Sequence, residues 1–346
     1  MSDRPSPRPS PTLEDVARAA GVSRATVSRV INQIRNVDPL IQAVVRQAIE
    51  ETGYVPNRAA RSLVTRRAGA VALVVSGAGE DGDSDEQLLT DPFFGRVATG
   101  VVNFLRPLGI HPVVMLADST DSRDQVVADL RRGTADGALL VSTHSADTLP
   151  LDLLEAQLPT VVFARPPGPQ RVSFVDLAHY DGGRIAAEHL VSIGRRFLTA
   201  ISGPFDVMAS QERLAGFREA AARHGQPYVP VHVGRFTQES GEWGMKALLA
   251  ENPKLDAVFA ANDLMGQGAV HVLREHGKRV PEDVAVVGFD DSSAATASRP
   301  ALTTVRQPVE DMAAEMARLL LDHLERPEAG PSSVIFEPTL VRRQSA

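Results

Sequence analysis

The amino-acid sequence predicts an α plus α/β chain, in which a three-helix domain built on a helix-turn-helix precedes two doubly wound α/β lobes. Three observations carry this prediction. Residues 12–32, TLEDVARAAGVSRATVSRVIN, have the pattern of two short helices around a tight turn. From Ala70 onward, short apolar runs alternate with helical segments, as in parallel sheets covered by helices. The first 67 residues hold eleven arginines against six acidic residues, whereas the remainder holds 25 basic against 37 acidic residues.

This division of charge indicates two different tasks along the chain. The first 67 residues carry a net charge of +5 and the remainder carries −12, which together give the formal −7 of the whole chain. A basic module is attracted to a polyanion, whereas an acidic body is repelled by it. We therefore expect the N-terminal part to meet nucleic acid.

The helix-turn-helix segment contains its own start and stop signals. Thr12 is expected to cap the first helix together with Asp15, as in a capping box. Gly21 supplies a residue that tolerates a left-handed backbone at the helix end, and Ser23 can cap the second helix. Apolar residues give the pair one buried side, namely Leu13, Val16, Ala17, Ala20, Val22, Val27, Val30 and Ile31. Two helices joined this tightly form a helix-turn-helix.

The opposite side of the second helix is polar and carries Arg24, Thr26, Ser28 and Arg29. An arginine can read guanine through two hydrogen bonds in the major groove, and hydroxyl groups or a terminal asparagine suit phosphate oxygens. This face predicts a DNA reader that favours G·C-rich half-sites. The alternative is an ordinary solvated face on a small helix pair.

A third helix and a shorter one are expected next. Asp38 and Pro39 form an N-cap and a first helical residue, Gly53 ends the helix, and the expected inward residues are Leu40, Ile41, Val44, Val45, Ala48 and Ile49. Asn57 can then cap a helix of about eight residues, RAARSLVT, which is too short to be stable alone in water. It should form only when something holds it. An exposed Leu63 among arginines is unusual for a plain linker.

These segments resemble the lactose-repressor (LacI/GalR) family of transcription regulators, and the resemblance covers essentially the whole chain. TLEDVARAAGVSRATVSRVIN is similar to the family's helix-turn-helix, and YVPNRAARSL is similar to its hinge helix. The resemblance implies that the hinge helices of two protomers pair in the minor groove, where a leucine from each, here Leu63, wedges into the central base step. The expected DNA contacts are Thr12, Ser23, Arg24, Ala25, Thr26, Ser28, Arg29, Asn32, Asn36, Asn57, Arg58, Ala60 and Leu63.

From Ala70 the sequence predicts buried parallel strands separated by helices. The expected strands are VALVVS, HPVVML, GALLVS, TVVFA, LTAISG, AVFAAN and VAVVGFD, and their apolar character is typical of strands covered on both faces. They are enough for two doubly wound lobes. The family resemblance implies two similar lobes of the periplasmic-binding-protein type, joined by three crossovers, with the effector in the cleft between them.

The expected domain boundaries follow from these elements and from the resemblance. They are a disordered tail over 1–11, a helix-turn-helix domain over 12–56, a hinge helix and linker over 57–67, and an effector-binding and dimerisation domain over 68–346. Lobe 1 is expected at about 69–164 and 309–335, and lobe 2 at about 165–305 and 336–346. The final crossover is expected near Thr304 to Pro308, so that the helix MAAEMARLLLDHL returns to lobe 1.

Composition argues against a membrane or secreted protein. No apolar run reaches the roughly 18 residues needed to span a bilayer, and the N-terminus lacks the hydrophobic segment of a signal peptide. The chain has no cysteine, so it can form neither a disulfide framework nor a thiolate metal site. These features predict a cytoplasmic protein.

Motifs of catalysis and cofactor binding are also missing. Gly77, Gly79 and Gly82 formally satisfy the dinucleotide fingerprint, but the acidic residues that follow would repel a pyrophosphate, so a flexible acidic loop over 79–89 is expected instead. The nine histidines lack metal-ligand spacing, and no G-x-S-x-G elbow occurs. We expect no enzyme, no cofactor and no metal.

Polar side chains stand at three strand ends, where open α/β sheets bind their ligands. Arg213 follows the strand ending in SGP, Asn262 follows AVFAA, and Asp290 follows VAVVGF. The resemblance places effector contacts at these three positions, and together they offer donors and acceptors for vicinal sugar hydroxyls. Where the family lines its cleft, this chain has Phe93, Phe94, Phe163 and Phe236.

Each of these residues has an ordinary alternative role. Asp290 could cap a turn, Asn262 could start a helix, and Phe163 could belong to the core. Arg165, in FARPPG, could contact the ligand or close an interface between the lobes.

We therefore expect a homodimeric repressor that a small carbohydrate releases from a palindromic DNA operator. The segments YVPNRAARSLVTRR, AVFAANDLMG and EDVAVVGFDDS are similar to actinobacterial repressors of cellulose and oligosaccharide utilisation, which implies a β-linked disaccharide such as cellobiose. Two alternatives stay open. A purine-responsive, corepressed regulator would differ in the sign of its response, and a sugar-binding transport protein would share only the α/β body.

Overall fold

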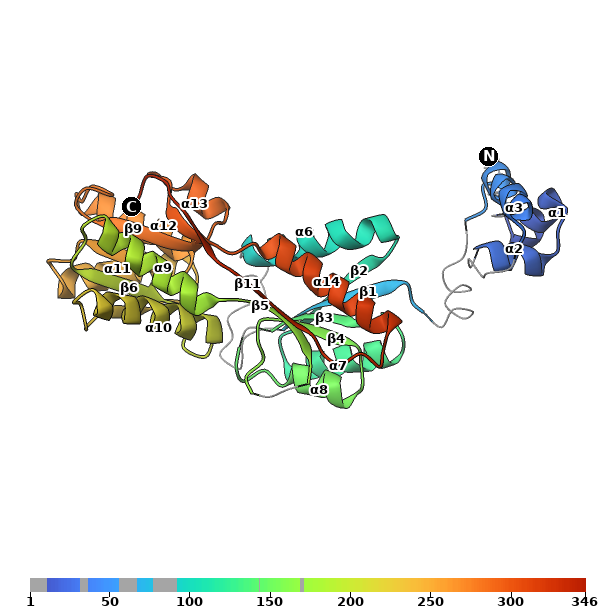
Figure 1. Cartoon of the computed structure of the whole chain (residues 1–346), viewed down its shortest axis with the longest axis horizontal. Helices are drawn as coiled ribbons and strands as arrows, with labels where there is room; N and C mark the ends of the chain where they lie inside the picture. Colours follow the sequence, from blue (N-terminus) through green and yellow to red (C-terminus); the bar gives the residue numbers. More distant parts are fainter. Residues whose placement is uncertain (1–10, 32–36, 56–66, 77–91, 143, 169–170) are drawn as a thin grey trace, which may run out of the picture. The chain divides into compact units, whose positions relative to one another are not determined.

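The computed structural model describes residues 11–31, 37–55, 67–76, 92–142, 144–168 and 171–346 (Figure 1). The chain forms two compact units that divide between Gly69 and Ala70. The expected N-terminal tail, the hinge helix and the acidic loop over 79–89 lie outside the described residues.

The first unit contains three helices, α1 (Leu13–Ala20), α2 (Arg24–Ile31) and α3 (Pro39–Thr52). The capping box is confirmed, since the Thr12 side chain accepts a hydrogen bond from the Asp15 backbone and the Asp15 carboxylate accepts one from the Thr12 backbone. Gly21 adopts the expected left-handed conformation with φ 65° and ends α1. The three helices share one small core of Val16, Ala17, Ala20, Val27, Val45 and Ala48.

The expected inward side of α3 was partly wrong. Leu40, Ile41 and Val44 are exposed, with Leu40 77% accessible, whereas Val45 and Ala48 are buried. Val45 and Ala48 are the buried α3 residues that share the core with α1 and α2, and Leu40, Ile41 and Val44 are not part of that core. Val44 also lies about 100° around the helix from Val45.

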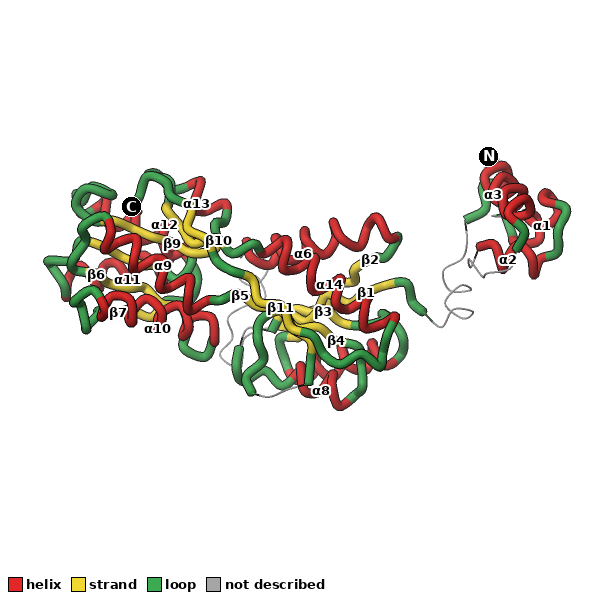
Figure 2. Tube along the Cα trace, viewed as in Figure 1, coloured by secondary structure: helices red, strands yellow, loops and turns green. Residues whose placement is uncertain are grey.

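The second unit consists of two lobes, each built on a six-stranded sheet (Figure 2). The lobe 1 sheet has the order β11-β5-β4-β3-β1-β2, with β1 (Ala70–Ser76), β2 (His111–Ala117), β3 (Ala138–Val141), β4 (Thr160–Phe163), β5 (Ser173–Leu177) and β11 (Ser333–Phe336). The lobe 2 sheet has the order β12-β10-β9-β8-β6-β7, with β6 (Leu198–Ser202), β7 (Val231–Val233), β8 (Ala257–Ala260), β9 (Ala285–Asp290), β10 (Thr303–Arg306) and β12 (Thr339–Val341). All pairings are parallel except that of β12 with β10.

Helices cover both faces of each sheet. In lobe 1, one face packs on α6 (Pro92–Leu105) and α14 (Val309–Glu325), and the other on α7 (Thr120–Arg131) and α8 (Leu149–Glu155); the 3-10 helix η1 (Arg106–Leu108) continues α6. In lobe 2, one face packs on α9 (His179–Ser192) and α10 (Met208–Arg223), and the other on α11 (Gln238–Glu251) and α12 (Asp263–Glu275), which contacts α13 (Ser293–Ala297). Alternate residues of β3 show why its sequence is apolar throughout: Leu139 faces the first layer and Leu140 the second.

The seven expected strands are all present, but the boundary of lobe 1 was placed too early. β5 pairs with β4 in parallel, with Phe163 opposite Val175, so lobe 1 continues to Leu177 rather than ending at 164. The crossover near Thr304 to Pro308 exists and leads into α14 on lobe 1, but it is not the final one. The chain also crosses from β5 to α9 and from β11 to β12 (Figure 1).

Helices α9 and α10 approach each other very closely in lobe 2. A Cβ atom added at Gly183 would lie 1.9 Å from the Arg213 carbonyl oxygen, and one added at Gly216 would lie 1.9 Å from the Tyr180 carbonyl oxygen. Only glycines permit this approach. The close packing of the two helices fixes the position of Arg213, which lies on α10. Among the described residues, no helix is both long and apolar enough to cross a bilayer.

We predict that Gly183→Ala destabilises the second unit by about 1 to 3 kcal/mol, because the new methyl group must push α10 away. Urea unfolding followed by the fluorescence of Trp243, the single tryptophan of the chain, measures the change. Gly95→Ala in α6 is the matched control, since its Cβ meets nothing within 4 Å. Equal stability of the two variants would contradict the close-packing argument.

Candidate functional site

The polar side of α2 is accessible, as a DNA-reading face requires. Ser23, Arg24, Ala25 and Arg29 are exposed, and Thr26 and Ser28 are half-buried. Val27, in contrast, is completely buried and anchors the helix to the core of the first unit. The six predicted contacts at Asn32, Asn36, Asn57, Arg58, Ala60 and Leu63 lie outside the described residues.

The groups on this face are held by weak interactions that DNA can replace. Arg24 pairs with Glu14 of α1 at 2.9 Å, and both side chains are more than half exposed. Such an exposed pair contributes at most about 1 kcal/mol. The Ser23 and Thr26 hydroxyls lie 2.9 Å apart, and the Thr12 hydroxyl donates to Asp15 at 2.8 Å. Guanine or phosphate oxygens can therefore replace Glu14 as the partner of Arg24 with little loss of free energy.

A cavity of about 470 Å³ lies between the two lobes, at the carboxyl ends of the strands. Strand order reverses in each sheet beside β1 and β6, which is where doubly wound folds bind ligands. Eight residues singled out from the sequence all line this cavity, namely Phe93, Phe94, Phe163, Arg165, Arg213, Phe236, Asn262 and Asp290. The fold thus brings together side chains that are up to 197 positions apart in the sequence, from Phe93 to Asp290.

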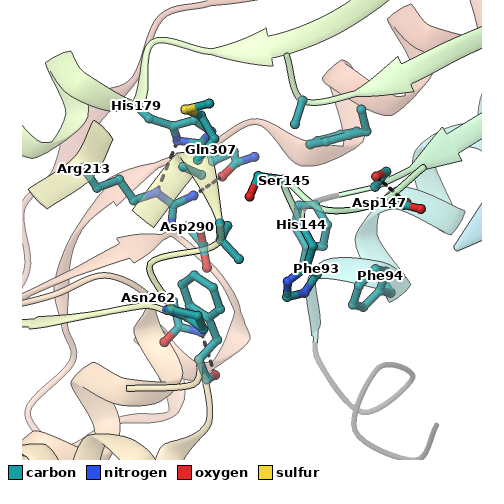
Figure 3. A pocket seen from close by; sticks show the side chains of 18 of the residues that line it. Phe93, Phe94, His144, Ser145, Asp147, His179, Arg213, Asn262, Asp290 and Gln307 are labelled. Atoms are coloured by element: carbon teal, nitrogen blue, oxygen red, sulfur yellow. Dashed lines mark hydrogen bonds and ion pairs between the residues drawn. The ribbon is translucent and has the colours of Figure 1, made fainter. Parts of the chain in front are cut away.

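Arg213 is the centre of the polar side of the cavity (Figure 3). Arg213 is 5% exposed, and its guanidinium carbon lies 3.7 Å from the centre of the Phe289 ring. Its hydrogen-bond acceptors are His179 Nδ1 at 3.2 Å, the Ala261 carbonyl at 2.6 Å, Asp290 Oδ1 at 3.4 Å and Gln307 Oε1 at 2.9 Å. This one side chain therefore holds together four separate segments: α9, the ends of β8 and β9, and the connection that follows β10.

His179 is neutral in this arrangement. Burial, and the nearby charges of Arg213 and Arg165, hold the pKa of His179 well below its usual value. Its Nδ1 accepts from Arg213, so the ring proton is on Nε2, which faces Asp176 at 3.6 Å. A neutral imidazole adds no charge to the cavity.

The ordinary roles considered for Asn262 and Phe163 are both realised. Asn262 caps α12 by accepting from the Met265 backbone at 2.9 Å, and its amide donates to the Phe236 carbonyl at 2.8 Å. Phe163 is 3% exposed in the core of lobe 1 and also packs edge-to-face on Phe93, with ring centroids 5.2 Å apart. Both residues also line the cavity, so the two kinds of role coexist.

Three non-glycine residues at the cavity have left-handed backbone conformations, and one of them is Ala164, with φ 81°. Phe236 has φ 62° and Asp290 has φ 103°. Such conformations cost about 1 to 3 kcal/mol each and persist only where neighbouring groups hold them. The Asn262 amide holds Phe236, and the Arg213 guanidinium contacts Asp290. Backbone strain of this kind is typical of ligand-binding sites.

Arg165 contacts a carboxylate in each lobe. Its Nε lies 3.5 Å from Asp176 of β5, and its Nη1 lies 3.9 Å from Glu212 of α10. Burial raises the pKa of Asp176, and likewise that of Glu212. Arg165 therefore both lines the cavity and helps to join the lobes.

A second contact between the lobes crosses the cavity near His144. The His144 ring lies 2.6 Å from the Asp206 carboxylate, and the Ser145 backbone donates to the Asp206 carbonyl at 2.9 Å. His144 and Ser145 follow β3 in lobe 1, whereas Asp206 follows β6 in lobe 2. Both lobe 1 residues line the cavity, and the lobes therefore meet over it.

The sequence did not reveal several residues of this site. Gln307, His179, Asp147 and Ser142 also line the cavity, and the Ser142 hydroxyl donates to Asp147 at 2.6 Å. Gln307 and His179 follow β10 and β5, which the sequence did not predict as strands, so the rule for strand ends could not be applied to them. Recognising SFVDL and TTVR as strands would have identified both.

The charges around the cavity balance. Its lining includes three arginines, at 165, 213 and 235, and three carboxylates, at 147, 239 and 290. Such a lining favours a neutral ligand rich in hydroxyl groups over a phosphate or a cation. Among the described residues, no group of three histidine or acidic side chains is arranged to hold a metal ion.

A fully buried carboxylate next to Asn262, that of Asp263, ties strand β10 to the loop that follows β9. Asp263 accepts from the Thr304 hydroxyl at 2.6 Å and from the Ser292 backbone at 2.7 Å. Burial raises the pKa of Asp263 to about 6 despite these hydrogen bonds, and the charge of Asp291 contributes in the same direction. Asp263 therefore ionises at a higher pH in the folded chain than in the unfolded chain.

Each of the two units matches a known protein family. Residues 12–57 match the model described as bacterial regulatory proteins, lacI family, and residues 187–346 match a periplasmic binding protein-like domain. The HTH-type transcriptional regulator CelR of Thermobifida fusca is 45% identical over 97% of this chain and 98% of that protein. A structure of a CelR–cellobiose complex is 43% identical, with a TM-score of 0.75 over 97% of this chain and 100% of that one. The lac repressor dimer bound to operator and the anti-inducer ONPF is 25% identical, with a TM-score of 0.80 over 97% and 98% of the respective chains.

We predict that Arg24→Ala weakens operator binding by about 1 to 3 kcal/mol per half-site and relaxes the base preference there, because it removes a bidentate contact. Fluorescence anisotropy with matched and singly mismatched operators measures both effects. Arg18→Ala is a suitable control, since Arg18 is an exposed residue of α1 that pairs with Asp15. If the variant discriminated between the matched and mismatched operators as well as the wild type does, Arg24 would not be a base-reading residue.

We also predict that Asp263→Asn changes how stability depends on pH. The folded pKa of about 6 exceeds the unfolded value of 3.8, so the contribution of this group is complete below pH 4 and is lost as the pH rises through 6. Asparagine does not titrate. The stability of the variant relative to the wild type should therefore increase between pH 4 and 7 by up to about 3 kcal/mol. Urea unfolding at several pH values tests this, and a difference that does not vary with pH would refute it.

Proposed function

The chain belongs to the lacI family of bacterial regulatory proteins, which are DNA-binding transcriptional regulators and not enzymes, and we propose that it is a repressor released from its operator by a β-linked disaccharide such as cellobiose. The observation that carries this proposal is the cavity between the lobes. The Arg213–Asp290 ion pair and aromatic rings from both lobes line this cavity, and the positive and negative charges of its lining are equal in number.

The polar side of this cavity suits the hydroxyl groups of a sugar, and the aromatic side suits its apolar ring faces. Arg213, Asn262 and Asp290 present donors and acceptors for hydroxyl groups. Phe93, Phe94, Phe163 and Phe236, together with Arg165, offer apolar surfaces and a further donor around the ring faces. Cellobiose as the specific ligand is supported by the CelR–cellobiose complex, which covers nearly the whole of this chain.

The first unit supplies DNA recognition. Arg24 and Arg29, on the exposed side of α2, read base edges, while Thr12, Ser23, Ala25, Thr26 and Ser28 support the contact with the operator. We propose that Asn32, Asn36, Asn57, Arg58, Ala60 and Leu63 complete the interface. The lac repressor dimer bound to operator supports a homodimer on a palindromic site. As a chromosome-binding regulator, the chain acts in the cytoplasm.

Release follows from linkage between the two sites. A sugar that favours one arrangement of the lobes changes the geometry in which the two hinge segments pair on DNA, and Leu63 then leaves its base step. Coupling energies between sites are typically about 1 to 3 kcal/mol, which corresponds to about 5- to 150-fold in affinity. Strong induction therefore needs the upper part of this range or sugar in both protomers.

The test is operator affinity measured by fluorescence anisotropy, using an operator selected from random DNA by the full-length chain. We expect millimolar cellobiose to weaken binding at least fivefold. Maltose, the α-linked isomer, is the matched control and should change the affinity less than twofold, because its second ring points in another direction.

Other outcomes would replace the proposal. Tighter binding in the presence of a purine would favour the corepressed alternative. Release by monosaccharides alone would exclude a disaccharide effector. No selection of a DNA sequence at all would contradict a repressor.

A further inference from the structure

An arginine of lobe 1 reaches the effector residues of lobe 2. Arg96 lies on α6, one turn beyond Phe93, and its side chain is 19% exposed. Its Nη1 donates to the main-chain carbonyl of Asp290 at 2.9 Å, and its Nη2 donates to the main-chain carbonyl of Gln307 at 3.1 Å. Nothing in the sequence analysis singled out this residue, because each of these partners is more than 190 positions away.

The two carbonyls belong to residues whose side chains hold Arg213. Asp290 Oδ1 and Gln307 Oε1 both accept from the Arg213 guanidinium. Arg96 therefore binds the backbones, and Arg213 the side chains, of the same two residues. Holding a residue at both its backbone and its side chain fixes the direction of the side chain.

The Asp290 backbone requires such support. Asp290 has φ 103° and Asp291 has φ 55°, so two consecutive non-glycine residues are left-handed. The Asp291 carboxylate is held by Arg306 and Arg343 of lobe 2. For Asp290, the side chain depends on Arg213, and its carbonyl accepts from Arg96 and, at 3.4 Å, from the Gln307 backbone. The left-handed turn that presents the Asp290 carboxylate is thus held partly from the other lobe.

Arg96 is itself fixed by a carboxylate of its own lobe. Glu310, in the first turn of α14, accepts from Arg96 Nε at 2.8 Å and from Nη2 at 2.7 Å. The hydrogen bonds from Arg96 lower the pKa of Glu310, so the carboxylate stays ionised near neutral pH. A bidentate pair sets the plane of the guanidinium and aims its Nη1 and Nη2 toward lobe 2.

We propose that Arg96 is a positioning residue of the effector site, which holds the backbones of Asp290 and Gln307 from lobe 1 so that the Asp290 carboxylate faces the sugar. This inference rests on the proposed function of the cavity. It adds that the polar side of the cavity is complete only when both lobes contribute to it. Arg96 is not among the residues that line the cavity, so it acts on the sugar through Asp290 and Gln307.

Isothermal titration of the full-length chain with cellobiose tests this. Arg96→Met should weaken sugar binding at least about tenfold, because Asp290 loses its backbone support. Arg96→Lys should fall between Arg96→Met and the wild type, since one ammonium can hold one carbonyl. Arg106→Met is the matched control on the exposed end of the same helical segment, where the Arg106 side chain donates to Asn103, and it should bind within twofold of the wild type.

A double-mutant cycle separates positioning from general stability. In an Asp290→Ala background there is no carboxylate to position. Adding Arg96→Met to that variant should therefore reduce the affinity for cellobiose by less than a further twofold. The sugar-induced shift of the melting temperature at high cellobiose concentration measures binding in these weak variants. An equal loss in both backgrounds would make Arg96 merely structural and overturn the proposal.

Two further results have clear meanings. A folded Arg96→Met variant whose cellobiose affinity stays within twofold of the wild type would also overturn the inference. If the wild type itself bound no cellobiose, the proposed function would fail first. The two failures are therefore distinguishable.

Discussion

Arg213 lines the cavity and is only 5% exposed, and a charge buried to that degree is very costly unless its N–H groups find acceptors. The acceptors come from α9, from the ends of β8 and β9, and from the connection that follows β10. These segments must therefore take up their positions together. The close approach of α9 and α10 at Gly183 and Gly216 sets where the arginine can stand.

This constraint explains the character of the cavity. Arg213 donates hydrogen bonds to protein groups and pairs with Asp290, so its positive charge is balanced within the protein and does not attract an anion. The left-handed backbones of Phe236 and Asp290 lie on the same wall and are held by Asn262, Arg213 and Arg96. A wall fixed in this way presents a ring and a carboxylate with little freedom, which lowers the entropy cost of binding a flexible sugar.

The sequence predicted those parts of the fold that depend on local pattern. Runs such as VALVVS are strands because both faces are covered, while Thr12 begins α1 through local hydrogen bonds and Gly21 ends it through backbone freedom. SFVDL and TTVR were missed because short strands with polar residues lack a clear period. Leu40 and Val44 were misplaced because an apolar residue alone does not reveal whether a neighbouring helix covers it. Gln307 and Arg96 depend on contacts with distant parts of the chain, which no spacing rule contains.

The buried Arg213 network forms the polar side of the proposed sugar site. Calorimetric titration of cellobiose into the full-length Arg213→Met variant tests it most directly, with the melting temperature recorded to establish that the variant is folded. The account predicts a loss of affinity of at least about tenfold, since hydrogen bonds to charged groups contribute about 1.5 to 3 kcal/mol. A folded variant that binds cellobiose within twofold of the wild type would contradict it.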